Sequence, residues 1–163
     1  MKLCKRIILL LLVASMLSVT VYAAGSLDKD RSVSLTISYR DNGTPLVGAE
    51  FSIYLVATVD EYGELTTTDT FKQFNVDIWG KNDDAWKTLA STLEGYVLRD
   101  SVMPTDSGKI DQNGYLTFPT SEKKLSQGLY LVLGKRHTQG NCYYDATPFM
   151  VMLPTQDTVK NEW

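Results

Sequence analysis

The hydrophobic and polar positions near residue 33 alternate, which predicts that the folded part of the chain begins with a β-strand. Apolar side chains fall on every second residue of 33–39, the period-2 pattern of a half-buried strand. Residues 41–45 read Asp-Asn-Gly-Thr-Pro, and Asn-Gly tolerates the positive φ of a tight reversal. A second strand follows over residues 49–55. Its residues on one face are Ala49, Phe51, Ile53 and Leu55.

Further strands are expected after the turn residues in the second half of the chain. They cover residues 115–118, 129–133, 141–144 and 149–153. Residues 60–63 form another turn, and residues 64–82 fit neither period, so we expect a partly ordered connection that packs on the core. The residues expected in the core are Phe51, Ile53, Leu131 and Val151.

One segment has helical rather than strand periodicity. We expect a short amphipathic helix at about 84–94, with its apolar face formed by Trp86, Leu89 and Leu93. Asp83 precedes it and suits a helix N-terminus, while Gly95 suits its end. Short strands with one helix predict a mainly β fold, a β-sandwich.

The N-terminus has the layout of a signal peptide. A basic start is followed by an apolar stretch that begins at Ile7 and contains no acidic residue before Asp28. Small residues then place the cleavage site between Ala23 and Ala24, so residues 1–23 would be removed. The alternative is an uncleaved anchor helix, which needs roughly 20 apolar residues; this stretch is interrupted by polar ones. Residues 24–32 are expected to be a flexible lead-in, and the protein to be secreted or held at the cell surface.

Charge and cysteine content narrow the class of protein. The formal charge of the whole chain is −3, and the signal peptide carries three cations and no anion, so the mature charge is −6. A surface of this sign repels nucleic acids, which we exclude as partners. Only Cys142 remains after cleavage, so no intramolecular disulfide can form. The length suits a single domain with an ordinary packed core.

The sequence offers no convincing catalytic or metal site. His137 and Cys142 could be imagined as a base and a thiol, but both lie in or beside a polar turn and no third group is evident. One His and one Cys cannot supply the ligands of a zinc site. Residues 106–114 lack the spacing of an EF-hand, so we interpret them as a turn that could at most hold an incidental calcium ion. We expect no cofactor and no enzyme activity.

Two surface features remain open. Asn42-Gly43-Thr44 spells a glycosylation site, but it is also a good turn. Aromatic residues at Trp79, Tyr143 and Tyr144 could stack on a carbohydrate; in a β-sandwich, however, such residues more often belong to the core or pair across strands.

Four blocks of the sequence resemble the N-terminal domain of backbone pilins and related surface adhesins of Gram-positive bacteria, of the prealbumin-like type called Cna B-type or SpaA-like. The blocks cover residues 34–56, 85–96, 127–132 and 147–154. The family turn Gly-x-Pro-Leu/Ile-x-Gly-Ala-x-Phe is matched by Gly43, Pro45, Leu46, Gly48, Ala49 and Phe51. The resemblance spans residues 33–163 and implies a prealbumin-like (Ig-like) sandwich with one inserted helix.

The resemblance also implies partners. Pilins of this kind are joined by a sortase, which links a lysine of one subunit to the sorting signal of another. That lysine lies beyond a strand that would begin near Trp163, and no LPxTG-like signal is present. We therefore expect a domain cut short at its C-terminus, or a secreted or degenerate relative. Sortase and other pilin subunits are partners if the full-length protein carries these signals.

Many domains of this family contain an intramolecular isopeptide bond between a lysine and an asparagine, promoted by a buried acid. The resemblance places Tyr39 at the lysine position and Gly134 at the position of the acid. A neutral lysine and a proton-shuttling acid are both required for the reaction, so we expect no isopeptide bond.

Two functions follow from the residues and the resemblance together. The first is a non-catalytic structural and adhesive module of a cell-surface or pilus-like protein. The alternative is a secreted ligand-binding module that recognises host glycan or matrix protein.

Overall fold

The structure is a computed structural model that describes residues 26–78 and 82–155. The expected signal peptide, with its cleavage site at Ala23 and Ala24, lies outside the described residues. The elements in chain order are β1 (Leu35–Ser38), β2 (Arg40–Asp41), β3 (Thr44–Pro45), β4 (Glu50–Val59), β5 (Leu65–Thr67), α2 (Asp69–Lys72), α3 (Asp83–Asp100), β6 (Asp106–Lys109), β7 (Tyr115–Phe118), β8 (Gly128–Gly134), β9 (His137–Gln139), β10 (Cys142–Tyr144) and β11 (Phe149–Leu153).

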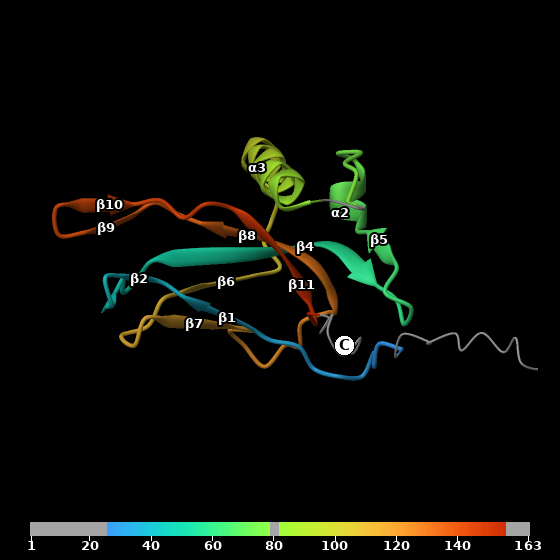
Figure 1. Cartoon of the computed structure of the whole chain (residues 1–163), viewed down its shortest axis with the longest axis horizontal. Helices are drawn as coiled ribbons and strands as arrows, with labels where there is room; N and C mark the ends of the chain where they lie inside the picture. Colours follow the sequence, from blue (N-terminus) through green and yellow to red (C-terminus); the bar gives the residue numbers. More distant parts are fainter. Residues whose placement is uncertain (1–25, 79–81, 156–163) are drawn as a thin grey trace, which may run out of the picture.

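The long strand β4 organises the larger sheet. It pairs antiparallel with β8 along one edge, and with β6 and then β5 along the other. β11 extends the sheet beyond β8, giving the order β11-β8-β4-β5. Both faces of β4 carry apolar residues because α3 covers one face and the β1–β7 pair lies on the other (Figure 1).

Each face of this sheet builds one hydrophobic cluster. The helix-side cluster joins the sheet to α3 and α2, and its buried members are Tyr54, Val56, Ala57, Phe71, Ile78, Leu89, Ala90, Leu93, Val97, Leu129, Leu131 and Leu133. The sandwich cluster joins the sheet to β1 and β7, and its buried members are Ile37, Leu46, Ala49, Phe51, Ile53, Ile110, Leu116, Phe118, Tyr130, Val132 and Leu153. The predicted β-sandwich with one covering helix is therefore confirmed.

Three of the four predicted core residues are buried. Phe51, Ile53 and Leu131 are 3%, 0% and 0% exposed. Val151 is only half-buried, so its assignment to the core was too strong. It lies on β11, which is the edge strand of the sheet, and an edge strand has a neighbour on one side only.

The helix docks as predicted, but it is longer. Leu89 and Leu93 are buried in the helix-side cluster, and Trp86 packs against it. Gly95 does not end the helix, because its position is open to solvent and Val97 continues the buried face. The helix ends at Asp100, and its C-cap residue Ser101 adopts the left-handed conformation with φ of 52°.

Strands β6 and β9 were missed because their residues are polar, and the short strands β2, β3 and β5 were missed as well. β6 lies in the stretch 106–114 that we interpreted as a turn, and β9 lies in the polar stretch before β10. Both are held by backbone pairing, β6 to β4 and β9 to β10. The β9–β10 hairpin extends from one end of the sandwich (Figure 1). The connection after β4 contains β5 and α2, and it buries Phe71 and Ile78 as expected.

The described part of the lead-in is packed against the domain, whereas we expected it to be flexible. Leu27 is 3% exposed, and its backbone N–H donates to the carbonyl of Glu61 at 2.9 Å. The side-chain amide of Gln127 donates to the carbonyls of Asp28 and Arg31 at 2.7 and 2.8 Å. These bonds attach the segment that precedes β1 to the turn after β4 and to the residue before β8.

Candidate binding groove

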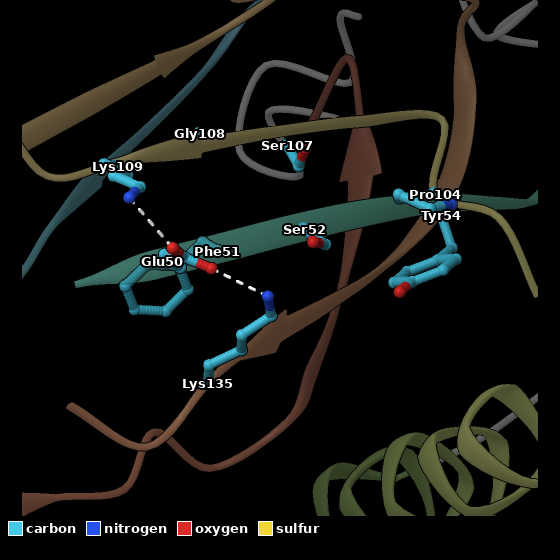
Figure 2. A pocket seen from close by; sticks show the side chains of 9 residues that line it. All are labelled: Glu50, Phe51, Ser52, Tyr54, Pro104, Ser107, Gly108, Lys109 and Lys135. Carbon is cyan, nitrogen blue, oxygen red and sulfur yellow. Dashed lines mark hydrogen bonds and ion pairs between the residues drawn. The ribbon is translucent and has the colours of Figure 1, made fainter. Parts of the chain in front are cut away.

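An open groove of about 440 Å³ lies on the helix-bearing face of the large sheet, beyond the part that α3 covers (Figure 2). We call it the β4–β6 groove. Its lining residues are Glu50, Phe51, Ser52, Tyr54, Pro104, Ser107, Gly108, Lys109 and Lys135. They come from β4, from β6 and the segment before it, and from the end of β8.

Strand alternation explains which side chains reach the groove. Successive residues of a strand point to opposite faces, so Glu50, Ser52 and Tyr54 face the helix side while Phe51 and Ile53 enter the sandwich cluster. Glu50 is in register with Lys109 of β6. On the other side, the backbone N–H of Lys135 donates to the carbonyl of Glu50 at 3.0 Å. Two lysines are thereby placed on either side of one glutamate.

These three residues form an ion network at one end of the groove (Figure 2). Lys109 Nζ lies 3.0 Å from Glu50 Oε1, and Lys135 Nζ lies 2.7 Å from Glu50 Oε2. The hydrogen bonds from Lys135 and then Lys109 lower the pKa of the Glu50 carboxyl to about 2. The bond to Glu50 also raises the pKa of Lys135. Both lysines are well exposed, so the network carries one net positive charge within reach of a ligand.

The other end of the groove is less polar. Tyr54 is 8% exposed and belongs to the helix-side cluster, and burial raises the pKa of its phenol. Pro104 lies beside Tyr54 (Figure 2). With Ser52 and Ser107 between the two ends, the groove can bind a ligand that combines hydroxyl or carboxylate groups with an apolar part.

The structure does not bring His137 and Cys142 together as a catalytic pair. Across the β9–β10 hairpin His137 is in register with Tyr144, and Cys142 with Gln139. Among residues 26–78 and 82–155, no three His, Cys, Asp or Glu side chains are grouped so that they could hold a metal ion.

The acidic residues between 106 and 114 accept hydrogen bonds from backbone N–H groups and from the hydroxyl of Thr120. Asp106 accepts bonds from the N–H and hydroxyl of Thr120 at 2.7 and 2.6 Å. Asp111 accepts from the N–H groups of Asn113 and Tyr115 at 2.8 and 2.9 Å. Their carboxylates therefore stabilise a strand end and a turn.

The other surface candidates that the structure describes lie at the β2–β3 turn and on the β9–β10 hairpin. Asn42 and Gly43 have positive φ in the turn between β2 and β3, as the turn interpretation predicts. Tyr143 is 74% exposed, whereas the hydroxyl of Tyr144 donates to Asp41 at 2.9 Å. Trp79 lies outside the described residues.

Tyr39 and Gly134 both lie against the ring of Phe51. The rings of Tyr39 and Phe51 are 5.2 Å apart and nearly perpendicular. A Cβ atom on Gly134 would lie 2.8 Å from the Phe51 ring and 2.6 Å from Cβ of Ala146. A larger side chain at position 134 would therefore require its neighbours to move.

Sequence reasoning missed the β4–β6 groove. Lys109 could not be placed opposite Glu50 because β6 was not predicted. The available signal was the position of Glu50 at the start of a strand, out of phase with Ala49 and Phe51.

Comparison with known proteins identified a family and distant structural likenesses. Residues 24–163 match the family model described as Gram-positive pilin subunit D1, N-terminal domain. Among solved structures, the fimbrial protein FimP from Actinomyces oris has 22% sequence identity and a TM-score of 0.43, over 85% of this chain and 29% of that one. The chain thus spans less than a third of the length of that fimbrial protein. The curated proteins gave no match. No helix of the described residues is long and apolar enough to cross a membrane.

Proposed function

Because this chain belongs to the family of Gram-positive pilin subunit N-terminal domains, we propose that it is a non-catalytic structural module of a pilus-like protein on the bacterial cell surface. The observation that carries this proposal is the family match over residues 24–163. In this role the sandwich supplies a stable unit, and its surfaces contact other pilin subunits.

Immunogold electron microscopy of cells that produce the protein tests this function. We expect antibody against the purified domain to label fibres or the cell wall. Label that is found only in the culture medium would contradict the structural role and favour a secreted one.

Export is part of the proposal. Residues 1–23 act as the signal peptide, and the mature protein begins at Ala24. N-terminal sequencing of the exported protein should read Ala-Gly-Ser-Leu. A mature protein that still begins at Met1 would refute cleavage.

Sortase and other subunits are the proposed partners of the full-length protein, provided that it carries a lysine motif and a sorting signal. Mass spectrometry of cell-wall digests should then find a peptide of the full-length protein joined to a sorting signal. Digests with unlinked peptides alone would argue against sortase assembly.

We also propose that the domain holds no intramolecular isopeptide bond. Tyr39 stands where the family lysine would be, and Gly134 stands where the promoting acid would be. The Phe51 ring lies between these positions, so aromatic packing replaces the covalent link. The intact mass of the mature domain should equal its sequence mass. A deficit of one ammonia, together with a cross-linked peptide in the digest, would refute this reading.

The second candidate function is recognition of host glycan or matrix protein, and the β4–β6 groove is the observation that favours it. Its exposed lysines and its hydroxyl groups suit a polar ligand. A glycan array and immobilised matrix proteins should bind the native domain but not a Lys109→Met/Lys135→Met variant. Lys87→Met, on the exposed face of α3, is the matched control. Equal binding by all three would place any ligand elsewhere.

A further inference from the structure

The sandwich cluster is left open along one side, between β1 and residues 145–149. Leu35, Tyr39, Ala146 and Val151 pack against this cluster but are only half-buried, and Phe149 is 38% exposed. A groove of about 420 Å³ runs between the two segments. We call it the edge groove. Apolar residues in a strand pattern are usually covered, but no described residues form a covering layer at this place.

One wall of the edge groove is the edge of β1, and the other is the segment that leads into the edge strand β11. Among the named strands of the described chain, β1 pairs only with β7, and β11 only with β8. The backbone N–H of Tyr39 points toward β7 and donates to the carbonyl of Gly114 at 3.1 Å. Backbone groups alternate in direction along an antiparallel strand. The N–H and C=O groups of Thr36 and Ser38 therefore point away from β7 and toward the groove.

The chemistry of the walls selects an uncharged occupant. The lining residues are Leu35, Thr36, Ile37, Ser38, Tyr39, Phe51, Asp145, Ala146, Thr147 and Phe149. Asp145 is the single charged group among them, and Arg136 neutralises it at 2.8 Å. A charged glycan gains no partner here. An extended peptide gains backbone hydrogen bonds from a free edge and apolar contacts at every second residue.

We propose that the edge groove receives a β-strand from a neighbouring pilin subunit, which adds to the free edge of β1 and covers the sandwich cluster. This inference rests on the proposed function, because pilin assembly supplies the neighbour. The free edge is four residues long, so the incoming strand is short and each contact is weak. Repetition along a fibre makes such contacts effective.

A peptide-binding assay with the exported chain tests the proposal. The probe is a fluorescent seven-residue peptide of alternating Thr and Val, and its control carries Pro at the central position. Fluorescence polarisation should show binding of the first peptide and at least about tenfold weaker binding of the second, which lacks a backbone donor. Failure of both to bind, or equal binding of both, would overturn the proposal.

Matched proline variants locate the binding edge. Ser38→Pro removes a donor that faces the groove, and an edge strand tolerates proline when its N–H is free. We expect about tenfold weaker peptide binding. Thr67→Pro is the control, because Thr67 lies on the edge strand β5 and its N–H points away from β4. That variant should bind within about twofold of the native chain. Native affinity in Ser38→Pro would overturn the assignment to β1.

Amide hydrogen exchange distinguishes a neighbour from the chain itself. The amides of Thr36 and Ser38 should exchange fast in the free protein and at least about tenfold more slowly with saturating peptide. Protection in the free protein that does not depend on its concentration would mean that its own chain fills the groove, and would overturn the proposal. These measurements use purified protein, so their failure is distinct from a failure to find the protein in pili.

Discussion

The two faces of the large sheet differ in how completely they are covered. On the helix side, α3 lies over the sheet, and Leu93 and Leu131 are fully buried. On the sandwich side, Phe51 is buried in the centre, but Leu35 and Val151 at the margin are only half-buried. The core is therefore closed under α3, whereas the sandwich cluster has an open side along the edge groove. The buried centres of both clusters account for stability, while the open side exposes one edge of β1.

The largest effect is expected at the centre of the sandwich cluster. Phe51→Ala should lower the free energy of unfolding by about 3–5 kcal/mol, because a buried aromatic ring is replaced by a cavity. The ring contacts Tyr39 and lies under Gly134, so little can collapse into the space. Urea unfolding measures the change. A loss under about 1 kcal/mol would mean that Phe51 is not a buried core residue.

A pair of variants compares the closed and open regions directly. Leu93→Ala, under α3, should cost about 2–5 kcal/mol. Val151→Ala, beside the edge groove, should cost only about 1 kcal/mol, because its side chain is already partly in water. Both are measured by urea unfolding of the same preparation. Equal losses would show that the sandwich side is as well covered as the helix side.

The sequence predicted those strands and the helix whose apolar side chains follow a regular pattern. Alternation located β1 and β4, an apolar run after turn residues located β8, and 3.6-residue periodicity located α3. The period alone could not locate β6, whose Asp-Ser-Gly-Lys sequence is polar on both faces and pairs through its backbone. Tertiary packing also overrides local preference: the helix continues through Gly95 because Val97 is buried beyond it.

The candidate sites were harder to predict than the fold. The β4–β6 groove depends on long-range register, since Glu50 meets Lys109 and Lys135 across two strand pairs. The edge groove exists because, among the named strands of the described residues, only β7 pairs with β1. The half-burial of Val151 follows from the edge position of β11, and the pattern of one strand carries no information about its neighbours.

A smaller effect is expected at the start of α3. The side chain of Asn82 accepts the backbone N–H of Ala85 at 2.9 Å, which caps the helix. Asn82→Ala should lower the free energy of unfolding by about 1 kcal/mol. Asn141→Ala, at the exposed β9–β10 turn, is the control and should stay within about 0.5 kcal/mol. Thermal unfolding followed by circular dichroism measures both. If the two variants are equally stable, the Asn82 cap does not contribute to the free energy of unfolding.

The smallest effect on stability is expected in the β4–β6 groove, where the prediction concerns pH. The pKa of Glu50 is lowered from 4.5 to about 2 by Lys135 and Lys109. Because the folded pKa lies below the unfolded one, this ion network contributes fully above pH 4.5 and its contribution is lost as the pH falls toward about 2. The lysines are exposed, so solvent screening keeps the effect on unfolding small.

Carbon-13 NMR titration of the Glu50 carboxyl measures this pKa directly. In the native chain the resonance should move with a midpoint near 2. In Lys109→Met/Lys135→Met the midpoint should rise toward the ordinary glutamate range, because both donors that stabilise the carboxylate are gone. Lys87→Met should leave the midpoint unchanged, since Lys87 pairs with Asp84 on α3. A native midpoint near 4.5, or a midpoint near 2 that persists in the double variant, would show that the two lysines do not hold Glu50 in solution. The groove would then present separate mobile charges to a ligand.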